Sequence, residues 1–280
     1  MTDRFTVGLV QINSSDELQA NIGAASDLIR QAAGQGAQLV LTPENTTMIT
    51  HGPEATRASA LPESDHPAIP AFAELSRELG IWLLIGSLSI RLDTGRAANR
   101  SFLFGPEGAI AARYDKIHMF DVDIPDGQNY RESETFQPGE EVVMAALPWG
   151  PLGLSICYDL RFPQLYRVLA KKGASFLSIP AAFTEFTGRA HWHVLLRARA
   201  IETGCFVFAP AQCGTHVANR RTYGHSLIVA PWGEVLADGA EAPGVVTAVI
   251  EPAKVEEARR MVPALTHDRP LRELAAAPGA

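Results

Sequence analysis

Cysteine is scarce in this sequence of 280 residues, which holds only Cys157, Cys205 and Cys213. This odd and sparse set has no metal-ligand spacing and is too small for a disulfide framework, so we expect reduced thiols and no metal centre. Cys205, within CFVFAP, is predicted to be a core residue. Cys213, within AQCGTH, lies in a loop that could face a site, although a structural role is favoured.

Long apolar runs and a surplus of positive charge are also missing. No apolar stretch approaches the roughly 20 residues that a transmembrane helix needs. The amino-terminal MTDRFTVGLVQI carries charges where a signal peptide would have a longer apolar segment. The 24 Lys and Arg are outnumbered by 31 Asp and Glu, which gives a net charge of −7. Nucleic acid and membranes are therefore not expected as partners, and a cytoplasmic location is predicted.

What the sequence does have is an alternation of short β-rich apolar runs with helical patterns along most of its length. Strands are predicted at 6–12, 38–41, 82–87, 101–104, 110–114, 142–146, 153–156, 176–179, 205–209, 226–230 and 245–250. Helices are predicted at 17–33, 68–79, 165–172, 190–202 and 253–261. No low-complexity linker divides the chain. We therefore predict one layered α/β domain over residues 1–270 and a loosely ordered tail at 271–280.

The most informative stretch is GPLGLSICYDLRFPQLYRVLAKKG, in which an apolar strand leads into Cys157 and a helical pattern then resumes. A thiol on such a turn would face a cleft, where the helix dipole and nearby N–H groups favour the thiolate and could hold an oxyanion. A buried structural cysteine is the alternative. The polar residues Tyr158, Asp159 and Arg161, which follow at once, favour a catalytic role.

Two charged residues also follow strand-like runs. Glu44, in QLVLTPENTT, comes after a predicted strand and a proline, at the kind of strand end where open α/β sheets gather ligands. Lys116, in ARYDKIHMFD, ends another run among apolar neighbours. Each residue has an ordinary alternative, an exposed turn glutamate and a solvated lysine. Their occurrence together with Cys157, each at a strand end, indicates a site.

These segments together resemble the nitrilase superfamily of carbon–nitrogen hydrolases, whose catalytic triad is Glu–Lys–Cys. Glu44 in LTPEN, Lys116 in YDKIHMFDVDIP and Cys157 in SICYDLRFP match that triad in order. Glu132, in YRESETFQPGE, falls where the family carries a second glutamate. The late stretch AHWHVLLRARAIETGCFVFAPAQCGTH resembles the Nit branch, and within it the deaminated-glutathione amidases more than the ω-amidases.

The resemblance implies a four-layer α-β-β-α sandwich that pairs into a homodimer or a larger homo-oligomer. It implies hydrolysis of a small carboxylate-bearing amide, with deaminated glutathione favoured, to an acid and ammonia. No metal and no organic cofactor are implied. The alternatives are an ω-amidase acting on α-ketoglutaramate, an N-carbamoyl amino acid amidohydrolase, and a catalytically silent binding or scaffold subunit.

The resemblance also implies a role for each residue. Glu44 would take the thiol proton while Cys157 attacks the amide carbon to form a thioester. Lys116 and the backbone N–H of Tyr158 would hold the oxyanion, and Glu132 would orient Lys116 or the substrate. Water activated by Glu44 would then hydrolyse the thioester.

Four further residues are candidates for substrate binding. Arg161, four residues after the nucleophile candidate, could bind a substrate carboxylate, or it could pair with Asp159 instead. The loop AAFTEFTGRAHW follows another predicted strand, so Phe183, Thr184 and Trp192 are expected to line the pocket. Packing is the alternative for the two aromatic residues.

Overall fold

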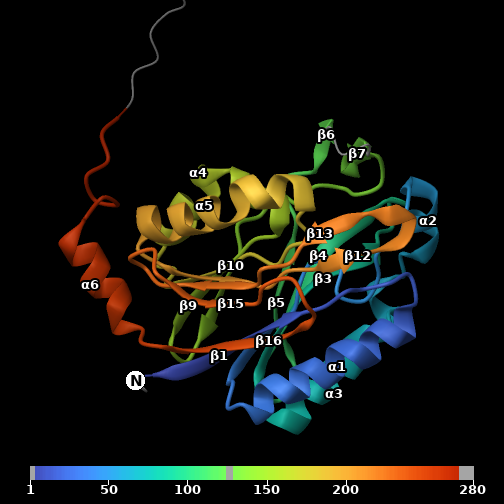
Figure 1. Cartoon of the computed structure of the whole chain (residues 1–280), viewed down its shortest axis with the longest axis horizontal. Helices are drawn as coiled ribbons and strands as arrows, with labels where there is room; N and C mark the ends of the chain where they lie inside the picture. Colours follow the sequence, from blue (N-terminus) through green and yellow to red (C-terminus); the bar gives the residue numbers. More distant parts are fainter. Residues whose placement is uncertain (1–3, 124–128, 271–280) are drawn as a thin grey trace, which may run out of the picture.

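Two six-stranded sheets form the centre of the protein, and helices cover the outer face of each sheet (Figure 1). The computed structural model describes residues 4–123 and 129–270. In Figure 1, α1 and α3 lie below the sheets, whereas α4 and α5 lie above them. The order of layers is therefore α-β-β-α, and the predicted fold class is confirmed.

Each sheet mixes parallel and antiparallel strands. The first has the order β16-β1-β2-β3-β4-β5. It consists of β1 (Phe5–Gln11), β2 (Leu39–Leu41), β3 (Trp82–Arg91), β4 (Ala97–Phe104), β5 (Ile110–Asp115) and β16 (Gly244–Ile250). The second has the order β15-β14-β11-β10-β9-β8. It consists of β8 (Met144–Leu147), β9 (Gly150–Leu154), β10 (Phe176–Ser178), β11 (Phe206–Ala209), β14 (Leu227–Val229) and β15 (Val235–Asp238).

The remaining elements are helices, short hairpins and single turns. The helices are α1 (Leu18–Gly34), α2 (Pro53–Ser59), α3 (Ala68–Leu79), α4 (Pro163–Lys171), α5 (Glu185–Thr203) and α6 (Ala253–Met261). The hairpins pair β6 (Asp121–Asp123) with β7 (Asn129–Arg131) and β12 (Cys213–Thr215) with β13 (Arg221–Tyr223). The 3-10 turns are η1 (Glu63–Asp65), η2 (Glu132–Glu134), η3 (Cys157–Arg161) and η4 (Val217–Asn219). Within the described ranges, no helix is long and apolar enough to span a bilayer.

The alternation of side chains along each strand decides which core they enter, since successive residues point to opposite faces of a sheet. On β1, Val7 and Leu9 enter the core shared by the two sheets, whereas Val10 packs with residues of α1 and α3. On β2, Leu39 and Leu41 belong to the shared core, and the intervening valine faces the helices. Both faces of these strands are buried, which explains their continuous apolar sequences.

α5 is longer than the sequence pattern predicted, because it begins at Glu185 and not at residue 190. Thr184 caps it, since its side chain accepts a hydrogen bond from the Thr187 N–H. Gly188 in the first turns made this stretch resemble a loop, yet a Cβ there would lie 2.4 Å from Tyr223. By contrast, α3 and α6 have the predicted bounds. The predicted tail at 271–280 lies outside the described residues, and the single domain over 1–270 stays a prediction.

Gly188→Ala should destabilise the protein, because the added methyl group would overlap Tyr223, and overpacking typically costs about 1–3 kcal/mol. Gly23→Ala in α1 is the matched control, because a Cβ there meets nothing within 4 Å. Alanine at that exposed helical position should add about 0.5–1 kcal/mol of stability. Urea unfolding measures both changes, and shifts of the same sign in the two variants would contradict the close contact.

Candidate active site

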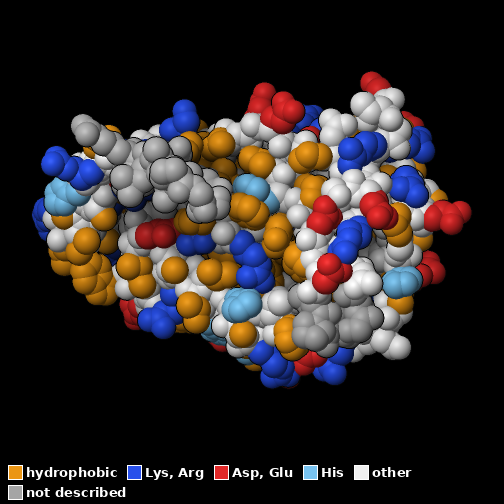
Figure 2. Space-filling model, turned by 90° about the horizontal axis from the view of Figure 1, so that it is seen from above, with side chains coloured by type: hydrophobic (Ala, Val, Ile, Leu, Met, Phe, Trp, Pro, Cys, Tyr) orange, Lys and Arg blue, Asp and Glu red, His pale blue; other side chains and the backbone are white. Residues whose placement is uncertain are grey.

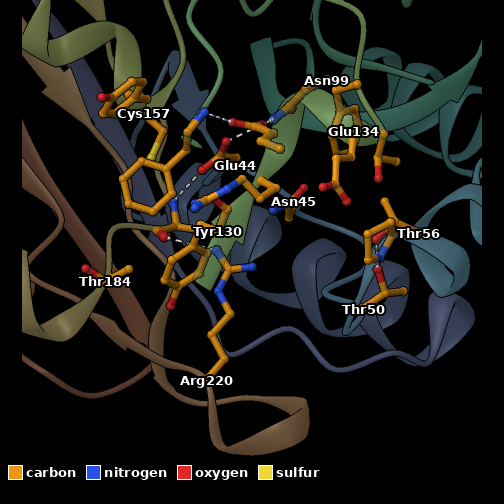
Figure 3. Close-up of a pocket in the computed structure, with 18 of the residues that line it drawn as sticks. Glu44, Asn45, Thr50, Thr56, Asn99, Tyr130, Glu134, Cys157, Thr184 and Arg220 are labelled. Atoms are coloured by element: carbon orange, nitrogen blue, oxygen red, sulfur yellow. Dashed lines mark hydrogen bonds between the residues drawn. The ribbon is translucent and has the colours of Figure 1, made fainter. Parts of the chain in front are cut away.

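A cavity of about 410 Å³ lies where strands from both sheets end. The residues that line it include Glu44 after β2, Lys116 after β5, Cys157 after β9 and Ala182 after β10 (Figure 3). Glu132, at the start of η2, completes the group. The structure therefore brings together all four side chains that the sequence marked as catalytic candidates.

The ammonium of Lys116 is 2% exposed and donates to two carboxylates. Its Nζ lies 2.9 Å from Glu44 Oε1, and 2.9 and 2.8 Å from Glu132 Oε1 and Oε2. A buried ammonium loses several kcal/mol of hydration free energy unless it is paired and hydrogen-bonded. The two carboxylates compensate for that loss and fix the position of the lysine.

Glu44 is 3% exposed, and both of its carboxylate oxygens accept hydrogen bonds. Oε1 accepts from Lys116 Nζ and from Asn99 Nδ2, each at 2.9 Å. Oε2 accepts from the Ala182 N–H at 2.9 Å, and the Cys157 thiol is close enough to this carboxylate for each group to shift the pKa of the other. Asn99 on β4, Lys116 after β5 and Ala182 after β10 therefore hold this carboxylate beside the thiol.

Cys157 begins η3 with a left-handed backbone, at φ 48°. Residues with a side chain seldom adopt this conformation, and where they do it is often at a functional site. The N–H of Cys157 donates to the Pro180 carbonyl at 2.9 Å. The next N–H, that of Tyr158, has no acceptor among the described residues. It is therefore available to an oxygen atom of a bound substrate.

Asp159 fixes this turn against the loop that carries Lys116. The side chain is fully buried, and its Oδ2 accepts from the Ile156 N–H at 2.9 Å and from the Tyr114 hydroxyl at 2.6 Å. Its Oδ1 accepts from the His118 N–H at 3.0 Å and lies 2.7 Å from the Nδ1 of the same residue. Tyr114 and His118 flank Lys116 in the sequence. The Asp159 carboxylate therefore fixes the turn of Cys157 relative to Lys116.

The surrounding charges determine the protonation state of the cysteine. Burial raises the pKa of Glu44, but the Lys116 ammonium and the hydrogen bonds to this carboxylate outweigh it and lower that pKa below its ordinary value. Burial raises the pKa of the Cys157 thiol well above its ordinary value, and the Glu44 carboxylate raises it further. Lys116 opposes these effects only in part. The raised pKa of Cys157 favours a neutral thiol at rest, contrary to the prediction that the turn favours a thiolate.

Known proteins match this chain over nearly its full length. The family model described as carbon-nitrogen hydrolase matches residues 6–260. The chain belongs to the carbon–nitrogen hydrolase family. Deaminated glutathione amidase of Yersinia enterocolitica is 42% identical over 266 residues, which are 94% of this chain and 92% of that protein. The protein of the same name from Homo sapiens is 40% identical over 269 residues, which are 94% of this chain and 82% of that protein.

Among solved structures, the crystal structure of the NitFhit protein of C. elegans superimposes with a TM-score of 0.89 at 37% identity. The match covers 96% of this chain and 66% of that chain. Sequence and fold thus agree on the carbon–nitrogen hydrolase family, and the prediction of an amidase-type hydrolase of carbon–nitrogen bonds is confirmed.

The substrate-binding candidates of this hydrolase divide into two pairs. Phe183 and Thr184 line the cavity, as predicted. Trp192 is absent from its described lining; it is fully buried and donates from Nε1 to the His225 carbonyl at 2.8 Å. Its ring packs against Phe183 at a centroid distance of 5.0 Å. Trp192 therefore supports the cavity wall from behind, and packing is the correct interpretation for it.

Arg161 does not form the ion pair with Asp159 that was the alternative to substrate binding, because Asp159 bonds to other groups. The guanidinium carbon of Arg161 lies 5.1 Å from the centre of the Phe183 ring and 5.9 Å from that of Tyr158. Its Nη1 lies 3.2 Å from His191 Nδ1. Arg161 is absent from the described cavity lining, but it packs on two residues that line it and interacts electrostatically with Cys157. Its role in substrate binding stays a prediction.

Among the lining residues that the sequence-based reasoning did not name, Asn99 and Arg220 have polar contacts next to Glu44. Asn99 Nδ2 donates to Glu44 Oε1 at 2.9 Å and to Glu132 Oε1 at 3.1 Å, so it bridges the two carboxylates. Asn99 occurs in an Asn-X-Ser triplet, which is a glycosylation signal in secreted proteins and does not indicate a buried residue. In the structure, however, Asn99 is buried. Arg220 also lines the cavity, and no local pattern in the sequence distinguishes it from neighbouring Arg221.

The two other cysteines lie away from this chemistry. Cys205 is fully buried, and its Sγ donates to the Ala174 carbonyl at 3.2 Å, so the core prediction is confirmed. Cys213 is 1% exposed and lies outside the described lining of the cavity, in agreement with the favoured structural role.

One group of side chains outside the cavity offers metal-ligand atoms. His193 Nε2 lies 3.1 Å from Asp238 Oδ2, and His225 Nδ1 lies 2.9 Å from Asp238 Oδ1. All three ligand atoms lie within 4.8 Å of one another. The same contacts act as hydrogen bonds that join α5 to β15. The absence of a metal centre stays a prediction.

Cys157 should contribute no thiolate absorbance at neutral pH, because burial and Glu44 raise the pKa of the thiol. Ultraviolet absorbance against pH, recorded for the wild type and for Cys157→Ala, isolates this residue. The other cysteines do not obscure the difference, since burial raises the pKa of Cys213 to about 11 and also raises that of Cys205. A difference spectrum that titrates at or below neutral pH would contradict this arrangement of charges.

Proposed function

We propose that this cavity hydrolyses a small carboxylate-bearing amide, with deaminated glutathione favoured, through a thioester on Cys157. The observation that carries the proposal is the hydrogen-bonded group of Glu44, Lys116 and Glu132 in one cavity with that thiol. The unused N–H of Tyr158 supports an oxyanion site beside it. The names of the Yersinia and Homo sapiens relatives support the choice of substrate.

In the first half-reaction, Glu44 accepts the thiol proton as the sulfur attacks the amide carbon. The raised pKa of Cys157 and the lowered pKa of Glu44 disfavour proton transfer at rest. The transfer therefore accompanies the attack, when negative charge moves from sulfur to the carbonyl oxygen. Glu44 then protonates the departing amine, and the acyl group remains as a thioester.

The developing oxyanion is stabilised by the Tyr158 N–H and the Lys116 ammonium, and loss of one such donor typically costs about 3 kcal/mol. The three N–H bonds of Lys116 face three carboxylate oxygens in the structure. Lys116 therefore acts on the oxyanion as a nearby charge or exchanges one of its two bonds to Glu132. Glu132 orients Lys116 throughout the cycle.

In the second half-reaction, Glu44 is again a carboxylate and removes a proton from a water molecule that attacks the thioester carbon. The oxyanion is held by the same donors as before. The proton returns to Cys157 as the carbon–sulfur bond breaks, which restores the neutral thiol. The chain's own side chains supply every proton transfer in this scheme.

With deaminated glutathione as the substrate, the second product is not the ammonia that the sequence-based reasoning predicted. The scissile amide of deaminated glutathione joins a 2-oxoglutaryl group to the amine of cysteinylglycine, so hydrolysis yields 2-oxoglutarate and that dipeptide. Ammonia is the second product only for a primary amide such as α-ketoglutaramate. That compound and N-carbamoyl amino acids are the alternative substrates. The cytoplasm stays the predicted compartment.

We also propose a homodimer or a larger homo-oligomer. Large apolar side chains project from one side of α5, where Phe186, Val194 and Ile201 are 52%, 67% and 56% exposed. Trp232, 59% exposed, is next to Gly233, which packs against Ile201. Figure 2 looks onto the side of α4 and α5, and hydrophobic side chains gather there among Lys and Arg. Apolar patches of this kind are typical of subunit interfaces.

Cys157→Ala should lower kcat for deaminated glutathione by about 10⁴-fold or more, because removal of a nucleophile abolishes the covalent route. Cys213→Ala is the matched control and should keep its activity, since that buried thiol lies outside the described cavity lining. Glu44→Gln should lose about 10²- to 10⁴-fold as a general base. Release of 2-oxoglutarate measures all three, with circular dichroism to verify folding.

The same assay, run on α-ketoglutaramate and an N-carbamoyl amino acid, compares the substrate classes. A preference for either compound would keep the chemistry and overturn the choice of deaminated glutathione. A folded Cys157→Ala protein with full activity would overturn the thioester mechanism.

Val194→Glu should weaken self-association, because a carboxylate at the centre of the apolar patch would be desolvated in an interface. Light scattering after gel filtration gives the molar mass of the wild type and the variant. Val249→Glu is the matched control, since this residue is 56% exposed but lies on β16, away from α5. A monomeric wild type, or equal masses for both variants, would count against an interface on α5.

A further inference from the structure

Arg220 differs from the other Lys and Arg side chains that line the cavity. Lys116 is held by two carboxylates, and Arg131 Nη2 donates to Asp123 Oδ1 at 2.6 Å. No carboxylate within the described ranges forms an ion pair with Arg220. Its Nη2 donates to the Ala182 carbonyl at 3.3 Å, and its Nε is buried without a hydrogen-bond partner among the described residues.

An unsatisfied guanidinium N–H inside a cavity is unfavourable, because the donor has lost water and gained nothing in exchange. The guanidinium carbon of Arg220 also lies 5.8 Å from the centre of the Tyr130 ring, and an aromatic ring does not replace a hydrogen-bond acceptor. Arg220 lines the cavity, and the only acceptor described for its terminal nitrogens is the Ala182 carbonyl, at 3.3 Å from Nη2. A ligand with an acceptor group could bind these terminal nitrogens when it enters the cavity.

Ala182 relates Arg220 to the proposed reaction centre. Its N–H donates to Glu44 Oε2, and its carbonyl accepts from Arg220 Nη2. The guanidinium and the Glu44 carboxylate therefore lie on either side of a single residue. In Figure 3, Arg220 extends from the lower edge of the cavity towards Glu44 and Tyr130. An acceptor bound by Arg220 would be only a few bonds from an amide carbon beside Cys157.

A tight hairpin turn carries Arg220. η4 closes the β12–β13 hairpin, and its residues Ala218 and Asn219 both have left-handed backbones, at φ 54° and 58°, as a type I′ turn requires. The Arg220 N–H donates to the Val217 carbonyl at 3.2 Å, and the Arg220 carbonyl accepts from the His216 N–H at 2.8 Å. These two hydrogen bonds fix the backbone from which the guanidinium extends.

We infer that Arg220 is the carboxylate-binding residue of the cavity and selects amides with a carboxylate a few bonds from the scissile bond. The inference rests on the proposed function and gives Arg220 the role that the sequence suggested for Arg161. A guanidinium can hold a carboxylate through two parallel N–H bonds, and its two terminal nitrogens form one such pair.

The carboxylate has two sources in deaminated glutathione. One is the 2-oxo acid group, on the acyl side of the scissile bond. The other is the terminal carboxylate of cysteinylglycine, on the amine side. The chemistry at Arg220 is the same for both, and two substrate pairs separate them. Glutaramate against pentanamide replaces only the acyl-side carboxylate by a methyl group. Deaminated glutathione against its terminal carboxamide changes only the amine-side carboxylate.

The test compares kcat/KM for both pairs in the wild type, Arg220→Gln, Arg220→Lys and Arg131→Gln. Arg220→Gln should lower kcat/KM for the carboxylate member of one pair by about 10- to 100-fold, mainly through KM, with little change for its neutral partner. Arg220→Lys should recover part of the loss, because the charge remains but the paired N–H geometry does not. Arg131→Gln, whose arginine already has a carboxylate, should stay within about twofold of the wild type.

Loss confined to glutaramate places the recognised carboxylate on the acyl side, and loss confined to deaminated glutathione places it on the amine side. An equal loss for both members of each pair, or an equal loss in Arg131→Gln, would overturn the inference. Full activity of Arg220→Gln on all four compounds would overturn it as well.

Calorimetric binding of 2-oxoglutarate and of cysteinylglycine gives a readout that does not need turnover. Arg220→Gln should weaken binding of one of these products by about tenfold or more. Unchanged binding of both would overturn the inference even if the enzyme is active. A folded wild type that hydrolyses no amide would instead overturn the proposed function, while weaker product binding in Arg220→Gln would still support the carboxylate site.

Discussion

The candidate site depends on the two ion pairs that the buried ammonium of Lys116 forms with Glu44 and Glu132. Lys116 is 2% exposed and its ammonium lies between the two carboxylates. None of these charges is favourable alone in such a place, because each has lost much of its hydration. Together they stabilise one another, and the pKa of Lys116 rises well above its ordinary value despite burial. The loop that carries Glu44 must therefore meet the segment of Lys116 and Glu132, although Lys116 lies 72 residues further along the chain.

This arrangement also affects the protonation of the Cys157 thiol. A carboxylate beside Cys157 makes a thiolate unfavourable, although an ammonium is close by. In the proposed mechanism, the proton stays on sulfur until an amide carbon is present to receive the electron pair. A thiolate reacts faster with oxidants and alkylating agents than a neutral thiol does. Arg220, another cation that lines the cavity, lies on the other side of Ala182 from Glu44.

Local patterns located Glu44 and Cys157, because each follows an apolar strand and a strand end is visible in sequence alone. The order of layers came from the family resemblance, since it depends on pairings such as β1 with β16, at opposite ends of the chain. Nearness in sequence suggested a pair between Arg161 and Asp159, but the guanidinium of Arg161 packs on aromatic rings instead. Arg220 was missed because its contact with Ala182 joins residues 38 apart, and no periodicity encodes such an approach.

The most direct test of the account is mass spectrometry of the wild-type enzyme, quenched in acid during turnover of deaminated glutathione and then digested. The account predicts a 2-oxoglutaryl group on the peptide that contains Cys157, removed by treatment with hydroxylamine as a thioester would be. Rapid turnover with an unmodified Cys157 peptide at every quench time, or with the acyl group on the peptide of Cys213, would contradict it.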